Sequence, residues 1–255
     1  MITATEHHQH FVCDLETLDV NSTAVVLSIA LVPFSAATCS LSPIEPLYIQ
    51  LPAGAIQEQI DAGRTVSAGT LRFWFEQPDA PRNELFVGGD LTWADVVSHV
   101  VAYIENHARY ASKRAVMWGN GSGFDCSILR SFIETTPAWR REAPFRYADD
   151  RDVRTVLDLS PESKNVPLPE SFVKHEALSD ALHEAAMVCD ALRRINNRVV
   201  TGRIRPFGDL IDEYEDELKA EYEDELKVDT AKADTANESR HSERELSSNE
   251  SAAKQ

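Results

Sequence analysis

Apolar and polar positions alternate along the N-terminal part of the chain in the way that is typical of β-strands. In Phe11–Thr17 the apolar residues at 11, 13 and 15 share one face, and the residues at 12, 14 and 16 share the other. A second, mostly apolar run covers Ala24–Val32, and the turn-forming sequence Asp19–Ser22 separates the two runs. We therefore predict a hairpin at the middle of a sheet, with Leu47–Leu51 as a third strand.

Segments further along the chain have the spacing of helices. Thr92–Ala108 carries an apolar stripe, and Ala68–Gln77 and the segment from about Ser179 to Ile195 are further helical candidates. Arg114–Gly119 has the pattern of a strand that ends at a glycine-rich loop, and a helix begins near Phe124. Strands first, and helices between the later strands, predict the α/β class with a mixed central sheet covered by helices.

The size and composition fit one such domain of roughly 200 residues and an appendage, because the chain has 255 residues of which 43% are apolar. The longest apolar stretch, Ala24–Phe34, is shorter than the roughly 20 residues that span a membrane. The four cysteines lie far apart and form no CxxC pair, which favours a reducing compartment over a disulfide framework. We expect a cytoplasmic protein without a membrane partner.

The net charge of −17 is concentrated at the C-terminal end. Residues 211–255 hold 15 Asp and Glu against 6 Lys and Arg, a net charge of −9, and they include the sequence EYEDELKAEYEDELK. We expect residues 209–255 to form an acidic, repeat-containing and largely disordered tail. Three roles are open for such a tail: it keeps the protein soluble, it competes with nucleic acid for a groove, or it docks a partner. Neither part of the chain is basic, which taken alone argues against a nucleic-acid partner.

Candidate chemistry begins with Asp14 and Glu16, which are two positions apart on the first predicted strand. Their side chains point to the same face, with Cβ atoms roughly 7 Å apart. Partly buried carboxylates need a compensating positive charge, and a hard cation such as Mg²⁺ or Mn²⁺ prefers oxygen ligands. A pair of solvated carboxylates at a strand end explains the same two residues.

A second candidate, Asp125, follows the glycine-rich loop Gly119–Gly123. Three glycines in five residues indicate a close approach to the backbone, since glycine is otherwise entropically costly. The loop lacks the Lys-Ser/Thr of a phosphate-binding P-loop. Capping of the following helix is the alternative role for Asp125.

The third candidate is the pair His175 and Asp180, five residues apart. Asp180 is expected in the first turn of a helix and His175 on the loop before it. This arrangement suits a fixed metal ligand beside a titratable base, although a surface histidine and a helix-terminal aspartate fit the pattern too. His183, further along the helix, is expected to be solvated.

Together these residues predict a two-metal site. Two cations about 4 Å apart can hold an attacking water and a leaving oxygen across a phosphodiester, while His175 takes the proton from the water. The charge objection to nucleic acid then disappears, because a loaded site is positive whatever the sum of the side-chain charges.

The motifs that carry these residues resemble the DEDDh superfamily of 3′–5′ exonucleases. The resemblance rests on DLETL at Asp14–Leu18, GFDCSIL around Asp125, and HEALSDA at His175–Ala181. The sequences RFWFEQ from Arg72, WGNG from Trp118, RDVRT from Arg151 and VPLP from Val166 are similar to the phage exonuclease A (DexA) branch. That branch is close to the RecE-like and mycobacterial exoribonuclease-like groups.

This resemblance implies an RNase H-like sheet and release of nucleoside 5′-monophosphates from a 3′ end. By correspondence, Asp14, Glu16 and Asp180 would hold a first Mg²⁺ or Mn²⁺, and Asp125 would help to hold a second. The general base would be His175. It also implies that Thr17 and Leu18 contact the terminal nucleotide, Leu18 as a wedge against its base. The exonuclease domain would span residues 8–208, followed by the tail at 209–255.

For the substrate we expect single-stranded nucleic acid, with DNA favoured by the phage branch. The alternatives are a 3′–5′ exoribonuclease acting on short RNA, and a non-catalytic module that binds nucleic acid or protein. The sequence leaves the oligomeric state open.

Several neighbouring residues have two interpretations. Phe73, Trp74 and Phe124 could stack on a base, although aromatic residues in a helical stripe more often belong to the core. Five arginines could contact a phosphate backbone or simply be solvated, namely Arg140, Arg141, Arg146, Arg151 and Arg154.

Overall fold

The computed structural model describes residues 9–83, 87–108, 115–137 and 142–200. The chain divides into two units, residues 1–197 and 198–255, and of the second unit only the end of one helix is described. The expected tail at 209–255 lies outside the described residues, as do both limits of the expected domain at 8 and 208. None of the helices in the described ranges combines the length and the apolar character needed to cross a membrane.

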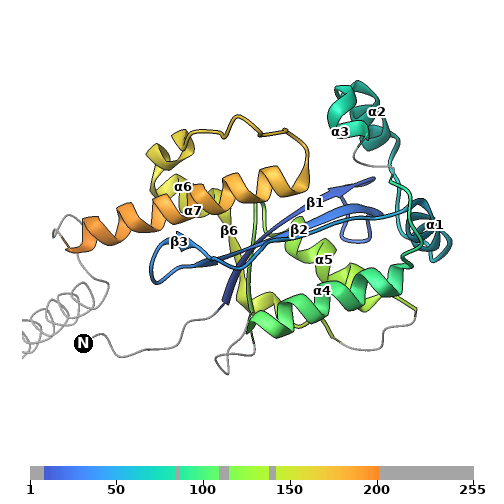
Figure 1. Ribbon diagram of the computed structural model, residues 1–255, viewed down its shortest axis with the longest axis horizontal. Coiled ribbons are helices and arrows are strands. Elements are labelled where there is room, and N and C mark those ends of the chain that lie inside the picture. The colour runs from blue at the N-terminus through green and yellow to red at the C-terminus, as the bar shows by residue number, and fades with distance from the viewer. Residues whose placement is uncertain (1–8, 84–86, 109–114, 138–141, 201–255) are drawn as a thin grey trace, which may run out of the picture. The chain divides into compact units, whose positions relative to one another are not determined.

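A mixed sheet forms the centre of the first unit (Figure 1). Its strand order is β3-β2-β1-β5-β6, and β4 pairs with β2. The strands are β1 (Gln9–Thr17), β2 (Val26–Ser35), β3 (Ser40–Leu41), β4 (Leu47–Gln50), β5 (Ala115–Gly119) and β6 (Asp150–Asp152).

Strand directions place the end of β1 beside the end of β5. The hairpin of β1 and β2 is antiparallel, with Leu15 opposite Ile29, as the sequence predicts. Strand β5 runs parallel to β1, with Val12 opposite Trp118, and β6 runs parallel to β5. Because parallel strands end at the same edge of a sheet, Glu16 and the loop after Gly119 are neighbours at that edge.

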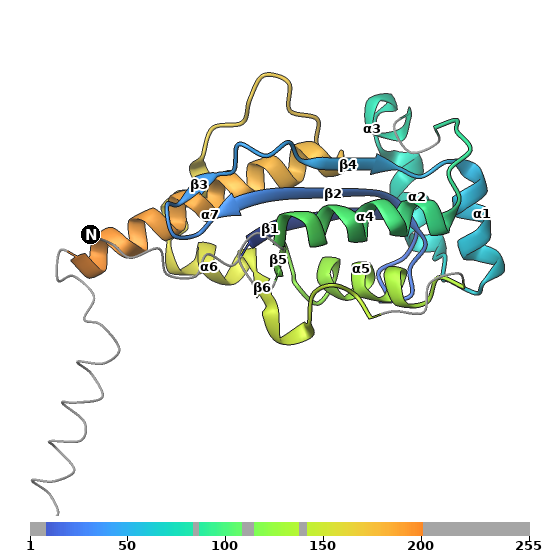
Figure 2. The ribbon, with the colours of Figure 1, turned by 60° about the horizontal axis from the view of Figure 1, so that its bottom comes forward.

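Helices cover both faces of the sheet (Figure 2). They are α1 (Ala53–Asp61), α2 (Ala68–Glu76), α3 (Asp79–Asn83), α4 (Trp93–Ala108), α5 (Asp125–Glu134), α6 (Val153–Leu159) and α7 (Ala177–Val200). Two short 3₁₀ helices cover Tyr147–Asp149 and Pro161–Asn165. The expected α/β class, with helices on a mixed sheet, is confirmed.

The alternation in β1 produces two separate cores. Phe11 and Leu15 belong to the core beneath α1, α4 and α5. Val12, on the opposite face, packs with residues of α6 and α7, among them Val156 and Ala181. Asp14 and Glu16 share the face of Val12, so they point toward the side of the sheet that α7 covers.

The first residues of β2 and α7 differ from the predicted ones, and backbone hydrogen bonds explain the difference. Strand β2 begins at Val26, because the N–H groups of Ala24 and Val25 donate to Asn21 and Thr65 instead. Helix α7 begins two residues before Ser179, and the N–H of Asp180 donates to the carbonyl of Glu176 at 3.0 Å.

Candidate active site

The end of β1 supplies the first two carboxylates of the site. Asp14 is half-buried and Glu16 is 9% exposed, and a register shift between Glu16 and Thr17 ends the regular pairing there. Both side chains therefore sit on the face covered by α7, close to the edge where β5 ends. The alternative of a solvated strand-end pair does not fit this burial.

Asp125 enters the site from the first turn of α5. Asp125 is 3% exposed, and its carboxylate accepts hydrogen bonds from the backbone of Leu15 and Asn120. The N-cap of α5 is Phe124 rather than Asp125. A Cβ atom at Gly119 would lie 2.9 Å from both Cβ and Oδ2 of Asp125, so one of the three loop glycines is required by close approach of this side chain.

His175 and Asp180 complete a cluster with Glu16. One ligand atom from each of these three residues lies within 4.8 Å of the others. His175 has a positive φ of 64°, and its backbone N–H donates to Oδ2 of Asp180 at 2.8 Å. This hydrogen bond ties the loop that carries the imidazole to the first turn of α7.

Burial raises the pKa of each of the four expected carboxylates, and repulsion by neighbouring carboxylates adds to the shift at Asp14 and Glu16. Burial is the main reason that the pKa of Asp14 is well above its usual value, and the charges of Asp125 and Glu184 add to the shift. The pKa of Glu16 is raised by burial and then by Asp180. Burial also raises the pKa of Asp125 to about 7, against hydrogen bonds that lower it. A cation would relieve this repulsion.

Burial also shifts the pKa values of Asp180 and His175. Burial raises the pKa of Asp180, and the hydrogen bond from the His175 backbone opposes the shift. The pKa of the His175 imidazole is lowered by burial, more than the charge of Asp180 raises it. A neutral imidazole, which is able to accept a proton, is therefore favoured near neutral pH.

Glu184 is a fifth carboxylate that the sequence interpretation missed. It lies on α7 four residues after Asp180 and is 5% exposed. Oε1 accepts a hydrogen bond from Nδ2 of Asn120 at 2.7 Å, and Oδ1 of Asn120 accepts one from Nε of Arg154 at 2.9 Å. The spacing of four residues was the available signal, because residues i and i+4 share a helix face.

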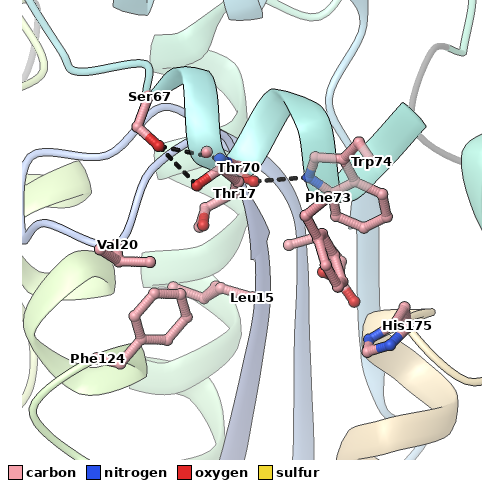
Figure 3. Close-up of a pocket in the computed structure, with 11 residues that line it drawn as sticks. Leu15, Thr17, Val20, Ser67, Thr70, Phe73, Trp74, Phe124 and His175 are labelled. Atoms are coloured by element: carbon pink, nitrogen blue, oxygen red, sulfur yellow. Dashed lines mark hydrogen bonds between the residues drawn. The ribbon is translucent and has the colours of Figure 1, made fainter. Parts of the chain in front are cut away.

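A pocket of about 540 Å³ opens beside the cluster (Figure 3). Glu16 and His175 form part of its wall, together with residues of the β1–β2 connection, α2 and the β5–α5 loop. The other lining residues are Leu15, Thr17, Val20, Ser67, Gly69, Thr70, Phe73, Trp74 and Phe124.

The two residues expected to contact a nucleotide are placed differently. Thr17 lines the pocket, and its hydroxyl donates to the carbonyl of Asp19 at 2.7 Å. Leu18 is 7% exposed, belongs to the core beneath α4 and is not among the pocket-lining residues. The exposed apolar side chain on this part of the wall is Val20, at 71% exposure.

The aromatic residues divide between core and pocket. Trp74 is buried, and its indole N–H donates to the carbonyl of Thr17 at 2.9 Å, which fixes α2 to the end of β1. Phe73 is 38% exposed and contacts the His175 ring edge-on, with centroids 5.1 Å apart. Phe124 packs against the core and also lines the pocket.

The expectation of a solvated His183 is wrong. The side chain is half-buried, with Nε2 3.1 Å from the carbonyl oxygen of Val166 and the ring beside Phe172. The long connection before α7 folds over this helix face and covers it.

The candidate arginines have different surroundings. Arg146 pairs with Asp149, whereas Arg151 bonds backbone carbonyls. Arg154 is exposed and reaches Asn120 beside the carboxylates. The positions of Arg140 and Arg141 lie outside the described residues.

Comparison with known families identifies the group to which the chain belongs. Residues 9–192 match a family described as the 3′-5′ exoribonuclease Rv2179c-like domain. The chain belongs to this family. The expected membership of the DEDDh superfamily is thereby confirmed.

Solved structures with a similar fold include exonuclease I from Methylocaldum szegediense, at 15% identity over 73% of this chain and 40% of that chain, with a TM-score of 0.45. E. coli exonuclease I with single-stranded DNA and zinc is also 15% identical, over 81% of this chain and 43% of that chain, with a TM-score of 0.45. The nuclease domain of 3′hExo, a DEDDh family member bound to rAMP, is 10% identical over 74% and 94% of the two chains, with a TM-score of 0.44. This chain therefore spans less than half of those exonuclease I chains. No curated protein sequence matches it.

Proposed function

We propose that this chain is a divalent-metal-dependent exonuclease that shortens single-stranded nucleic acid from the 3′ end and releases nucleoside 5′-monophosphates. One observation carries the proposal. Ligand atoms of Glu16, His175 and Asp180 lie within 4.8 Å of one another, and Glu16 and His175 line a pocket whose other lining is largely apolar and aromatic. Such a pocket can receive a base and sugar while the carboxylates face the phosphodiester.

The donor set fits hard cations. Asp14, Glu16, Asp125 and Asp180 offer carboxylate oxygens, which Mg²⁺ and Mn²⁺ prefer. Among the ion pairs of the described residues, none involves these four side chains. Buried carboxylates without basic partners are costly, so the site gains stability from a bound cation.

Each residue receives a role in this proposal. Asp14, Glu16 and Asp180 would hold a first ion, and Asp125 would help to hold a second. The ions, when bound, would lower the pKa of an attacking water and neutralise charge that develops on the phosphate. The imidazole of His175 would take the proton from the water, and Thr17, which lines the pocket, would position the terminal nucleotide.

The assignment of His175 as base has its own test. His175→Ala should lower kcat by about 10²- to 10⁴-fold, the usual contribution of general base catalysis. The affinity for Mn²⁺, measured by calorimetry on the same variant, should stay close to that of the wild type. A large loss of Mn²⁺ affinity would instead make His175 a ligand, which its position beside Glu16 and Asp180 also permits.

DNA and RNA are the two candidate substrates. The resemblance to the phage exonuclease branch favours DNA. RNA is the second candidate, because the family to which the chain belongs is described as an exoribonuclease domain. Recognition of the 2′-hydroxyl distinguishes the two, so matched oligomers of both kinds provide the comparison.

The decisive experiment uses single-stranded DNA and RNA oligomers labelled at the 3′ or the 5′ end, with Mn²⁺, Mg²⁺ or EDTA. We expect metal-dependent shortening from the 3′ end by the wild type. Asp14→Asn, which keeps the shape of the side chain but removes its charge, should abolish the shortening. No cleavage of either polymer under either metal would overturn the enzymatic proposal in favour of a binding module.

A further inference from the structure

Glu184 is a buried carboxylate in addition to the four that the sequence predicts for the site. It follows Asp180 by one helical turn on α7, on the face of the sheet toward which Asp14 points. The charge of Asp125 raises the pKa of Glu184, and Glu184 in turn raises the pKa of Asp14 more than either Glu16 or Asp180 does. Glu184 is therefore part of the same carboxylate cluster, on the side of Asp125.

One oxygen of this carboxylate is fixed by a hydrogen-bonded chain. Nδ2 of Asn120 donates to Oε1 of Glu184, and Oδ1 of Asn120 accepts from Nε of Arg154. The amide of Asn120 is oriented by these two partners, because Oδ1 must face the guanidinium and Nδ2 must face the carboxylate. The side chain of Glu184 is thereby held in one orientation.

The other oxygen has no partner. Oε2 of Glu184 is buried, and no group in the described part of the chain donates a hydrogen bond to it. The side chains that act on Glu184 with their charge are Asp125 and Asp180, which repel it, and Arg154, which is joined to it through Asn120. A buried carboxylate oxygen among other carboxylates calls for a cation, since each of its carboxylate neighbours is an acceptor.

We propose that Glu184 is a fifth carboxylate ligand of the divalent-cation site, with Oε2 directed to the ion on the Asp125 side. Asn120 and Arg154 are positioning residues that set the orientation of the carboxylate. This inference rests on the proposed function, because it extends the ligand set of the same site. Helix α7 would then supply two ligands, Asp180 and Glu184, as β1 supplies Asp14 and Glu16.

The test is a direct measurement of Mn²⁺ binding by calorimetry on the full chain, without substrate. Glu184→Gln keeps an acceptor for Asn120 and removes the charge. We expect its Mn²⁺ affinity to fall by about tenfold or more, the lower end of the effects seen when groups that support metal sites are lost. In EDTA at a pH above about 8, where Glu184 is charged, the same variant should melt at a higher temperature than the wild type, because one repulsive charge is gone.

Two further variants separate ligation from a general effect of charge. Glu184→Asp keeps the charge but withdraws the carboxylate by one methylene, and a ligand in contact with the ion should lose affinity in this variant too. Asp190→Asn is the matched control on α7, because it removes the same charge from a side chain paired with Arg194. We expect its Mn²⁺ affinity to equal that of the wild type.

Unchanged Mn²⁺ affinity in Glu184→Gln would overturn the inference, and so would full affinity in Glu184→Asp or an equal loss in Asp190→Asn. These outcomes leave the proposed function intact, provided that the wild type binds Mn²⁺. A wild type that binds no Mn²⁺ would instead contradict the metal site of the proposed function itself.

Discussion

At the scale of single residues, Gly119 sets the position of Asp125. A Cβ atom at residue 119 would lie 2.9 Å from Cβ and Oδ2 of Asp125, closer than packed atoms approach. Gly119→Ala should therefore push the carboxylate away from Asp14 and Glu16. Overpacking of this kind costs about 1–3 kcal/mol of stability, and displacement of a reacting group by about 1 Å lowers activity roughly 100-fold.

Gly123→Ala is the control for this variant, because a Cβ atom at residue 123 would meet no atom within 4 Å. Both substitutions lie in the same loop and add the same methyl group. Melting temperature and initial cleavage rate would be measured for both proteins. Equal activity of the two variants would contradict the tight contact between Gly119 and Asp125.

The individual ligands could be predicted to different degrees. Strand alternation alone places Asp14 and Glu16 on one face, and that arrangement is confirmed by the two separate cores. Glu184 could not be assigned, because acidic residues four apart on a helix are equally typical of a solvated face. Its hydrogen-bond partner Asn120 and the guanidinium of Arg154 that bonds Asn120 are distant in sequence and come together only in the fold.

At the scale of elements, α2 forms one wall of the pocket and presents Phe73 beside His175 (Figure 3). An aromatic side chain that stacks on a base contributes about 1–3 kcal/mol to binding. Phe73→Ala should therefore raise KM for an oligomer roughly tenfold, with a smaller change in kcat.

Phe75 provides the control on the same helix. It is 75% exposed and does not line the pocket, so Phe75→Ala should leave KM unchanged. Steady-state kinetics with one oligomer would compare the two variants with the wild type. If KM rose equally for Phe75→Ala and Phe73→Ala, the effect of Phe73 could not be assigned to its place on the pocket wall.

Elements with strong periodicity could be predicted, and short or irregular ones could not. The apolar stripe of α4 and the alternation of β1 each have enough residues to define a period. Strand β6 has three residues, Asp150–Asp152, all polar, and it exists because β5 offers a parallel edge. Helix α1 is stabilised by tertiary contacts, since Gln59 bonds both the N–H and the carbonyl of Val26.

At the scale of the whole molecule, we propose that residues 8–208 form the exonuclease domain and that the acidic segment after it is dispensable for catalysis. Deletion of residues 211–255 removes a net charge of −9. The shortened protein should cleave oligomers at least as fast as the full chain, because none of the expected site residues lies in the segment. A faster rate at low salt would indicate that the segment competes with nucleic acid for the site.

A loss of activity on deletion would assign the segment to the domain instead. The control is a protein with the same residues present and the acidic side chains of 213–227 changed to their amides. Equal rates for this protein and the full chain would exclude competition by charge.

The concentration of buried carboxylates also makes the stability of the whole domain depend on pH when metal is removed. Folding raises the pKa of Asp125 from 3.8 to about 7 and that of Glu184 from 4.5 to about 8. A carboxyl whose pKa is raised keeps its proton in the folded state at pH values where the unfolded chain has lost it. Stability therefore falls as pH rises from about 4 to about 8, by up to about 1.4 kcal/mol per pH unit for each such proton.

Thermal unfolding in EDTA should accordingly give a lower melting temperature at about pH 8 than at about pH 6. Saturating Mg²⁺ should remove most of this difference, because the cations then neutralise the carboxylates that protons neutralise at lower pH. Asp14→Asn should show a shallower decline in EDTA, since one of the repelling charges is absent. A melting temperature that rises with pH across this range in EDTA would mean that the carboxylates do not repel one another in the folded protein, and the argument for a cation site would lose its electrostatic basis.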